Sequence, residues 1–225
     1  MSLPGRTRSR AVRLVLVVAA VLVALVGGVL VGRALPDAPG ERSAAVGFAR
    51  DMTVHHQQAI AMAYEAIQEA PSAEVRQLAV DIASTQGNQV GRMQALLREW
   101  GHPLTGSAPA MAWMASADAH APHAEQAQQG GAPMPGMASA EEMARLAELT
   151  GQEFEVHFLQ LMLRHHAGGL QMAEAGAELV GDEQLRELAE AIATSQSSET
   201  QVLEDLLTER GAEPLPLPAA EAAGA

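Results

Sequence analysis

The sequence has 225 residues, is rich in Ala, Leu and Val with 3% aromatic residues, and contains no cysteine. The length fits one domain with flanking segments, and the composition favours packed helices over a β-sheet. The lack of cysteine excludes disulfides, thiolate metal sites, iron–sulfur clusters and a cysteine nucleophile. All 14 basic residues are arginine and the formal net charge is −13, so nucleic acid is not an expected partner.

The N-terminus has the pattern of a membrane-directed segment. Residues 1–13 are rich in arginine, and the 19-residue apolar run over 14–32 follows. As a helix this run would be about 28 Å long, close to the thickness of a bilayer core. Because arginine-rich flanks stay in the cytoplasm, we expect the rest of the chain outside it. The run is either a single-pass anchor or a signal segment cleaved near Gly32-Arg33-Ala34, which would leave a secreted protein.

After a linker over 33–45, the chain repeats itself. Shifting the sequence by 110 residues aligns 46–101 with 156–211 without a gap and gives 17 identities in 56 positions. Each copy is predicted to form a helix, a short turn and a second helix. Two helical hairpins must pack together to bury their apolar faces. The expected fold is therefore all-α, a four-helix bundle with one long crossover.

The predicted boundaries follow helix-capping signals. Ser72 and Asp182 are expected to cap the second helix of each copy, and Ser139 with Glu142 forms a capping-box pattern for an extra helical stretch. Copy 1 covers 46–101, a Pro- and Gly-rich linker covers 102–139, and a helical lead-in with copy 2 covers 140–211. A short helix is expected near Met111 to Ala115. The tail over 212–225 is expected to be disordered.

Each copy carries a Met-x-x-His-His-x5-Met pattern, and the helical repeat places its members within an arc of about 120° on the core-facing side. The candidate metal ligands are Met52, His55, His56, Met62, Met162, His165, His166 and Met172. Thioether sulfur prefers Cu(I), and imidazole also binds copper, so Cu(I) or Cu(II) is the expected metal. Because protonated imidazole cannot ligate, binding is expected to weaken below about pH 6.5.

Other residues contribute weaker candidates. The second helices place Gln89 and Glu199 at equivalent positions, where either could bind metal or orient a histidine. A ferritin-type iron site would need several inward carboxylates, and only Glu155 and Glu199 are candidates. The linker offers a second set of soft ligands, namely Met111, Met114, His120, His123, Met134 and Met137.

At the level of these motifs the chain resembles a bacterial family known as domain of unknown function 305. The resemblance is carried by FARDMTVHHQQAIAMA (48–63), VRQLAVDIASTQ (75–86), PGM (135–137), FEVHFLQLMLRHHAGGLQMA (154–173) and LRELAEAIATSQSSE (185–199). It implies a ferritin-like four-helix fold, an exported copper-binding role, and the eight Met and His ligands given above. The family's usual Gln-x-x-Glu with a later Met is altered in this chain, at Gln89 in copy 1 and Leu203 in copy 2.

Three functions agree with these patterns. The favoured hypothesis is a non-enzymatic protein that sequesters copper or passes it on in metal homeostasis, with the metal ion as its partner. The second is a ferritin-like, metal-dependent oxidase, which would need an open coordination position. The third is a metal-free helical interaction module in which the Met and His side chains only pack. The sequence names no protein partner.

Overall fold

The computed structural model of the protein describes residues 12–25, 38–114 and 134–216. The chain divides into two units, Met1–Ala38 and Pro39–Ala225. In the first unit, residues 12–25 form a helix. Across the three described ranges, no helix is both long enough and apolar enough to span a bilayer. The predicted transmembrane helix over 14–32 is therefore not supported, and its second part, 26–32, lies outside the described residues.

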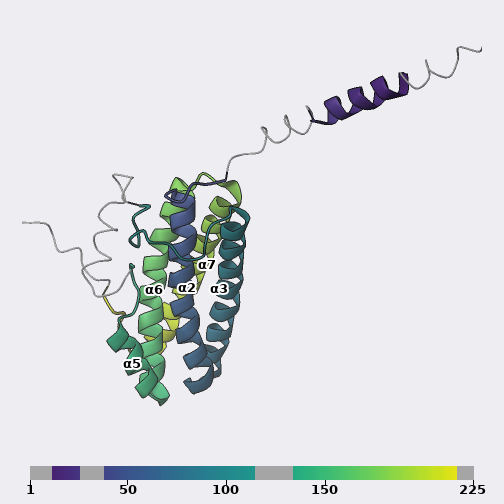
Figure 1. Ribbon diagram of the computed structural model, residues 1–225. Coiled ribbons are helices and arrows are strands. Elements are labelled where there is room, and N and C mark those ends of the chain that lie inside the picture. Colours follow the sequence, from purple (N-terminus) through teal and green to yellow (C-terminus); the bar gives the residue numbers. More distant parts are fainter. Residues whose placement is uncertain (1–11, 26–37, 115–133, 217–225) are drawn as a thin grey trace, which may run out of the picture. The chain divides into compact units, whose positions relative to one another are not determined.

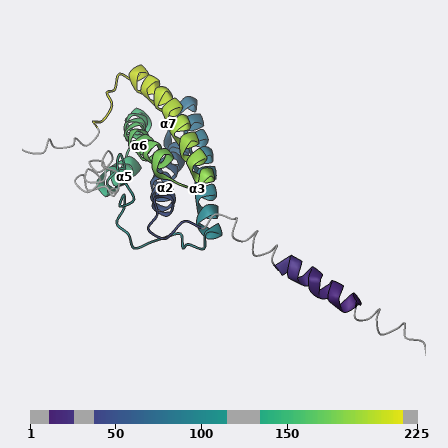
Figure 2. The same ribbon diagram turned by 90° about the horizontal axis from the view of Figure 1, so that it is seen from above.

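The second unit is the predicted four-helix bundle (Figures 1 and 2). Copy 1 forms α2 (Ala44–Glu69) and α3 (Ala73–Glu99), and copy 2 forms α6 (Gly151–Leu179) and α7 (Glu183–Glu209). The short helix α5 (Ala140–Glu148) precedes α6. Within the described part of the chain there is no β-strand. The all-α fold and the two hairpins are confirmed.

The helix ends follow the capping signals of the sequence. The side chains of Ser72 and Asp182 accept hydrogen bonds from Val75 N and Leu185 N at 3.4 and 2.9 Å. Ser139 and Glu142 form the reciprocal capping box at the start of α5. Gly101 and Gly211, which follow α3 and α7, adopt φ values of 76° and 63°. Glycine adopts this left-handed conformation without steric cost, so both copies end in the same way.

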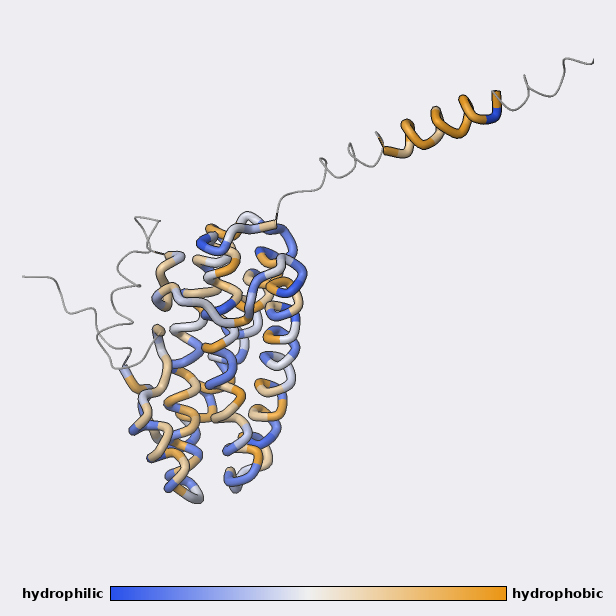
Figure 3. The backbone as a smooth tube through the Cα atoms, in the orientation of Figure 1, coloured by the Kyte–Doolittle hydropathy of each residue, from blue (hydrophilic) through white to orange (hydrophobic). Residues whose placement is uncertain are grey.

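The inner helices α2 and α6 pack against each other, and α3 packs mainly on α2 while α7 packs mainly on α6, so that α3 and α7 lie on the same side of the inner pair. Two apolar clusters fill the bundle. One of them, which we call the Met-rich cluster, contains Met52, Met93, Met111, Met114, Met134, Met137 and Met172. The second cluster contains Met62 and Met162. Each cluster thus pairs an early position of one inner helix with a late position of the other, so α2 and α6 run antiparallel. Figure 3 shows apolar and polar residues alternating along the helices, as expected for amphipathic bundle helices.

The described ends of the predicted linker pack closely on the bundle. Residues 110–114 form turns, so the expected short helix near Met111 is wrong. Met111 has φ of 65°, which a right-handed helix cannot contain. The carboxylate of Asp51 fixes this turn by accepting hydrogen bonds from Met111 N at 2.7 Å and Trp113 Nε1 at 3.0 Å.

The segment over 134–139, which we call the strap, crosses α2 and α6 on the way to α5. The side chain of Gln58 on α2 donates to the carbonyl oxygen of Ala138 at 2.9 Å and accepts from Ala138 N at 2.7 Å. On α6, a Cβ added to Gly168 would lie 2.1 Å from the carbonyl oxygen of Pro135. The strap backbone therefore rests directly on the helix backbone, which only glycine at this position allows.

Candidate metal centre

Four histidines meet in the interior of the bundle. His55 and His56 come from α2, His165 and His166 come from α6, and all four are 0% exposed. The rings of His55 and His165 face each other with centroids 3.8 Å apart and planes tilted by 37°. Within each pair of neighbours the centroids are 6.4 and 6.5 Å apart. The duplication therefore brings the first histidine of each motif together across the inner helix pair.

Hydrogen bonds fix which nitrogens of copy 1 are able to bind a metal. His55 Nε2 lies 3.1 Å from the carbonyl oxygen of Pro135 in the strap, and His56 Nε2 lies 2.8 Å from Gln89 Oε1. Both acceptors are oxygens, so each Nε2 donates its proton and each Nδ1 keeps its lone pair. Metal-binding histidines commonly donate their second N–H to a carbonyl or carboxylate in this way.

Copy 2 departs from this arrangement. His166 Nε2 lies 2.6 Å from Glu199 Oε2, and His166 Nδ1 lies 3.1 Å from the carbonyl oxygen of Met162. Both nitrogens of this ring are therefore engaged. By contrast, neither nitrogen of His165 has a hydrogen-bond partner among the described residues. Glu199 stands where copy 1 has Gln89, so one position of the repeat changes the chemistry of the second histidine pair.

Several buried polar atoms around the facing pair have no partner in the described part of the chain. They are Nδ1 of His55 and His56, both ring nitrogens of His165, and both side-chain amide atoms of Gln86 and Gln196. Buried polar groups without partners cost free energy, so their concentration at one place indicates a polar ligand. Gly169 makes room for this crowding, because a Cβ there would lie 2.5 Å from Gln196 Oε1 and 2.9 Å from His55 Cε1.

Burial keeps His55, His56 and His165 neutral. Loss of hydration lowers the pKa of His55 from 6.5 to about 4, even though the bond to Pro135 opposes the shift. The same effect, with the nearby His55, lowers the pKa of His56 to about 3. Burial also holds the pKa of His165 well below its usual value. Their lone pairs therefore remain free at mildly acidic pH. The loss of copper binding below about pH 6.5 stays a prediction, and the lowered pKa values move its expected onset to lower pH.

The predicted thioethers do not surround the histidines as one group. Met52 and Met172 lie in the Met-rich cluster, and Met62 and Met162 lie in the other. The histidines are thus between two methionine layers. No group of three or more His, Asp or Glu side chains within the described ranges is arranged to hold a metal ion.

The weaker candidates have varied positions. Glu199 contacts His166 as described, whereas Glu155 lies away from the histidines, bonded to Ser72 N at 2.7 Å and to Arg210 Nε at 2.8 Å. The inward carboxylates of a ferritin-type iron site are thus limited to Glu199 in the described residues. The four linker methionines, Met111, Met114, Met134 and Met137, are buried in the Met-rich cluster. His120 and His123 lie outside the described residues.

Sequence reasoning missed the partners that the strap provides. Pro135 orients His55 through its carbonyl oxygen, and Gln58 fixes the strap through Ala138. A contact made by a backbone oxygen cannot be predicted from the residue type, because every residue has that oxygen. The available signals were indirect: a Pro-Gly pair beside two methionines, and the paired glycines Gly168 and Gly169 within a helix, which indicate a close backbone approach.

Comparisons with known proteins agree with this architecture. Residues 45–207 match the model of a family described as domain of unknown function (DUF305). No curated protein matches the sequence. A DUF305 protein from Streptomyces coelicolor, described as a candidate secreted protein, has 42% identity and a TM-score of 0.69, covering 79% of this chain and 99% of its own. A DUF305 fragment from Deinococcus radiodurans has 30% identity and a TM-score of 0.61, covering 77% and 99%.

A more distant structural relative shares the fold. CopM in its Cu(I)-bound form has 23% identity and a TM-score of 0.54, covering 72% of this chain and 94% of its own. The family match spans most of the chain, including both helical hairpins and all four buried histidines. On this basis the protein belongs to the DUF305 family.

Proposed function

We propose that this protein binds copper outside the cytoplasm and sequesters it or passes it on. The observation that carries the proposal is the facing pair His55 and His165, whose ring centroids are 3.8 Å apart in the bundle interior. One nitrogen of His55 and both of His165 lack partners in the described residues. An apolar core tolerates such a pair when a ligand binds the nitrogen lone pairs that have no hydrogen-bond partner.

The proposed ligands follow from the free lone pairs. His55 Nδ1 and one nitrogen of His165 would bind first, and His56 Nδ1 also keeps a free lone pair. His166 would have to leave Met162 or Glu199 before it could ligate. Thioethers flank the histidines in both apolar clusters. Imidazole with thioether, without thiolate and with a single nearby carboxylate, favours copper over zinc or iron.

Two similarities support the metal and the location. CopM, which shares the fold, is known in Cu(I)-bound, Cu(II)-bound and Ag-bound forms. The Streptomyces coelicolor relative is described as a candidate secreted protein, and this chain begins with an arginine-rich segment and an apolar run typical of exported proteins. No catalytic residues are needed for this function, which is binding and release.

The test is a copper titration of the full chain. Cu(I) is titrated without oxygen in competition with a chromophoric chelator, and Cu(II) is titrated separately. The variant His55→Asn with His165→Asn should bind Cu(I) at the histidine centre at least about 100-fold more weakly, since even loss of a supporting residue costs 10- to 100-fold. The control is His102→Asn, because His102 lies outside the cluster and bonds to Pro39 and Glu41.

The outcomes separate the three functions of the sequence analysis. Equal Cu(I) affinity in the variant and the wild type would show that the facing pair is not the site. An absence of binding in a folded wild-type protein would favour the metal-free interaction module. Sustained oxygen consumption when Cu(I) is supplied in excess would instead identify an oxidase, whereas stoichiometric binding without turnover supports sequestration. Thermal unfolding of each variant confirms that it is folded.

A further inference from the structure

Two Met-x-x-Met turns approach the same end of the bundle. In the first, Met114 N donates to the carbonyl oxygen of Met111 at 3.0 Å, and in the second, Met137 N donates to that of Met134 at 3.3 Å. A turn closed in this way holds its first and fourth residues within about 7 Å of each other at Cα. All four methionine side chains are buried. Each turn therefore presents two neighbouring thioethers to the interior.

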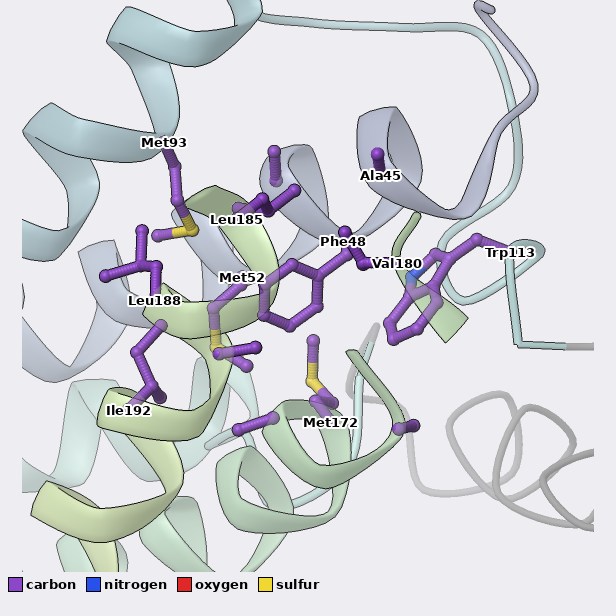
Figure 4. Packing of buried hydrophobic residues seen from close by; sticks show 14 of the residues in the cluster. Ala45, Phe48, Met52, Met93, Trp113, Met172, Val180, Leu185, Leu188 and Ile192 are labelled. Carbon is purple, nitrogen blue, oxygen red and sulfur yellow. The ribbon is translucent and has the colours of Figure 1, made fainter. Parts of the chain in front are cut away.

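These turns converge with methionines of the helices. Met52 of α2, Met93 of α3 and Met172 of α6 belong to the same apolar cluster as the four turn methionines. Figure 4 shows Met52 and Met172 beside the ring of Phe48, with Met93 and Trp113 on either side of that ring in this view. Seven of the 11 methionines of the chain are thus in one cluster. The other cluster, which fills the opposite end, contains Met62 and Met162 and is otherwise built mainly from Leu, Ala and Phe.

Packing does not require this uneven distribution. The second cluster shows that Leu, Phe and Ala can fill one end of this bundle. Methionine fills gaps but defines a core less firmly than leucine does. We therefore attribute the gathering of methionines at one end to the metal affinity of thioether sulfur, and not to the volume of the side chain.

Backbone strain accompanies the first turn. Met111 is the only non-glycine residue with positive φ in the described residues, at 65°, and its side chain is 0% exposed. Left-handed backbone is unfavourable for a residue with a side chain. The hydrogen bonds from Met111 N and Trp113 Nε1 to Asp51 hold the turn in this state. Such strain persists where a particular side-chain position is required, and here it turns a thioether into the core.

We propose that the Met-rich cluster is a second metal site, a thioether site for Cu(I), built by Met111, Met114, Met134 and Met137 with Met52 and Met172. The site goes beyond the histidine centre and uses none of its nitrogens, although Met52 and Met172 belong to the same sequence motifs as the histidines. Neutral thioethers suit a soft monovalent cation in an apolar interior, and the carboxylate of Asp51 lies next to Met111 at its edge. Thioethers do not take up protons in the physiological range, so the site holds Cu(I) at a pH that would protonate ordinary histidines.

The experiment uses the full chain and two probes, Cu(I) under a reductant and Ag(I), which has the same charge and does not change its oxidation state. The variant carries Met111→Leu, Met114→Leu, Met134→Leu and Met137→Leu, which nearly conserve core volume. The matched control is Met143→Leu, because Met143 packs at the other cluster. The variant should lose one equivalent of Cu(I) and of Ag(I), at pH 7 and at pH 5, and the control should lose none.

The histidine variant His55→Asn with His165→Asn separates this proposal from the first. It should still bind the equivalent of Cu(I) that the methionine variant loses. X-ray absorption of this bound Cu(I) should show sulfur ligands without nitrogen. A methionine variant that binds as many equivalents as the wild type would overturn the proposal. So would nitrogen ligands in the retained equivalent.

A measurement on the wild-type protein tests the same site without requiring that any variant folds. With methionine labelled by ¹³C at the ε-methyl group, one equivalent of Ag(I) beyond saturation of the histidine centre should shift the signals of the four turn methionines and of Met52 and Met172. Unchanged signals from Met111 and Met114 would count against the site. The signal of Met143 should stay in place and serves as the internal control.

Discussion

Metal-free protein should lose roughly 2 kcal/mol of unfolding free energy for each of His55 and His56 as the pH falls from 6.5 to 4.5, because one pKa unit corresponds to about 1.4 kcal/mol. Burial lowers the folded-state pKa of His55 to about 4 and of His56 to about 3 from 6.5. In this pH range the unfolded chain binds protons that the folded protein does not bind. The stabilisation is thus fully present above pH 6.5 and is lost as the pH falls towards the folded pKa values.

The loss would be a large part of the total, since domains are typically stable by 5–15 kcal/mol. It can be measured by urea unfolding in the presence of a chelator at pH 6.5, 5.5 and 4.5. Carboxylates with a lowered pKa, such as Glu41, Glu142 and Glu155, contribute mainly below 4.5, where their unfolded forms become protonated. The chosen range therefore reports mainly on the histidines.

The control for this effect replaces the titrating groups. A variant with His55→Gln, His56→Gln and His165→Gln should show a much flatter dependence of stability on pH than the wild type. A wild-type free energy that is constant between pH 6.5 and 4.5 would mean that the histidines are hydrated, contrary to their full burial. Bound copper should raise the free energy of unfolding throughout this range without flattening its dependence on pH, because a ligand that binds only the folded state stabilises it and leaves the histidines of the unfolded chain free to take up protons.

The second large effect concerns the strap. We expect Gly168→Ala to destabilise the protein by about 1–3 kcal/mol or more, as overpacked cores do. The added Cβ would lie 2.1 Å from the carbonyl oxygen and 2.3 Å from the carbonyl carbon of Pro135, and 2.7 Å from Gly136 N. These are backbone atoms, so a side-chain rotation cannot relieve the contact. The strap must move, and His55 then loses its bond to Pro135.

Gly91→Ala is the matched control. Gly91 lies in α3 on the exposed face, and nothing lies within 4 Å of a Cβ added there. Replacing glycine by alanine in an open helical position stabilises by about 0.5–1 kcal/mol. The two substitutions should therefore have opposite signs in urea unfolding. Hydrogen exchange at the amide of Ala138, which is bonded to Gln58, should become faster in Gly168→Ala; equal stability and exchange in both variants would show that the strap is not packed as described.

Much of the fold was predictable because its signals are local or repeated. Ser72 and Asp182 cap helices through their own side chains, and the capping box of Ser139 and Glu142 spans one helical turn. The periodic Met and His positions correctly predicted burial, because a helix places residues three and four apart on one face. The duplicated hairpin predicted the four-helix bundle, because neither copy can bury its apolar face alone.

The linker was harder to predict because its order comes from long-range contacts. Met111 lies in a turn, so no helix hydrogen bonds set its conformation. Its positive φ is held by a hydrogen bond to Asp51, which lies 60 residues earlier in the chain. The same holds for the strap, which Gln58 binds across 80 residues. Composition alone suggested a loose Pro- and Gly-rich connection, whereas the described ends are docked.

The sequence by itself determined the helices, their pairing into two copies and the burial of eight methionines and histidines, since these depend on helical periodicity and on repetition. Only the tertiary structure decided how these side chains group. The antiparallel packing of α2 and α6 makes His55 face His165 and sends Met52 towards Met172 and Met62 towards Met162. A pattern on one helix fixes which face its side chains share, but the direction of the partner helix determines which of them meet.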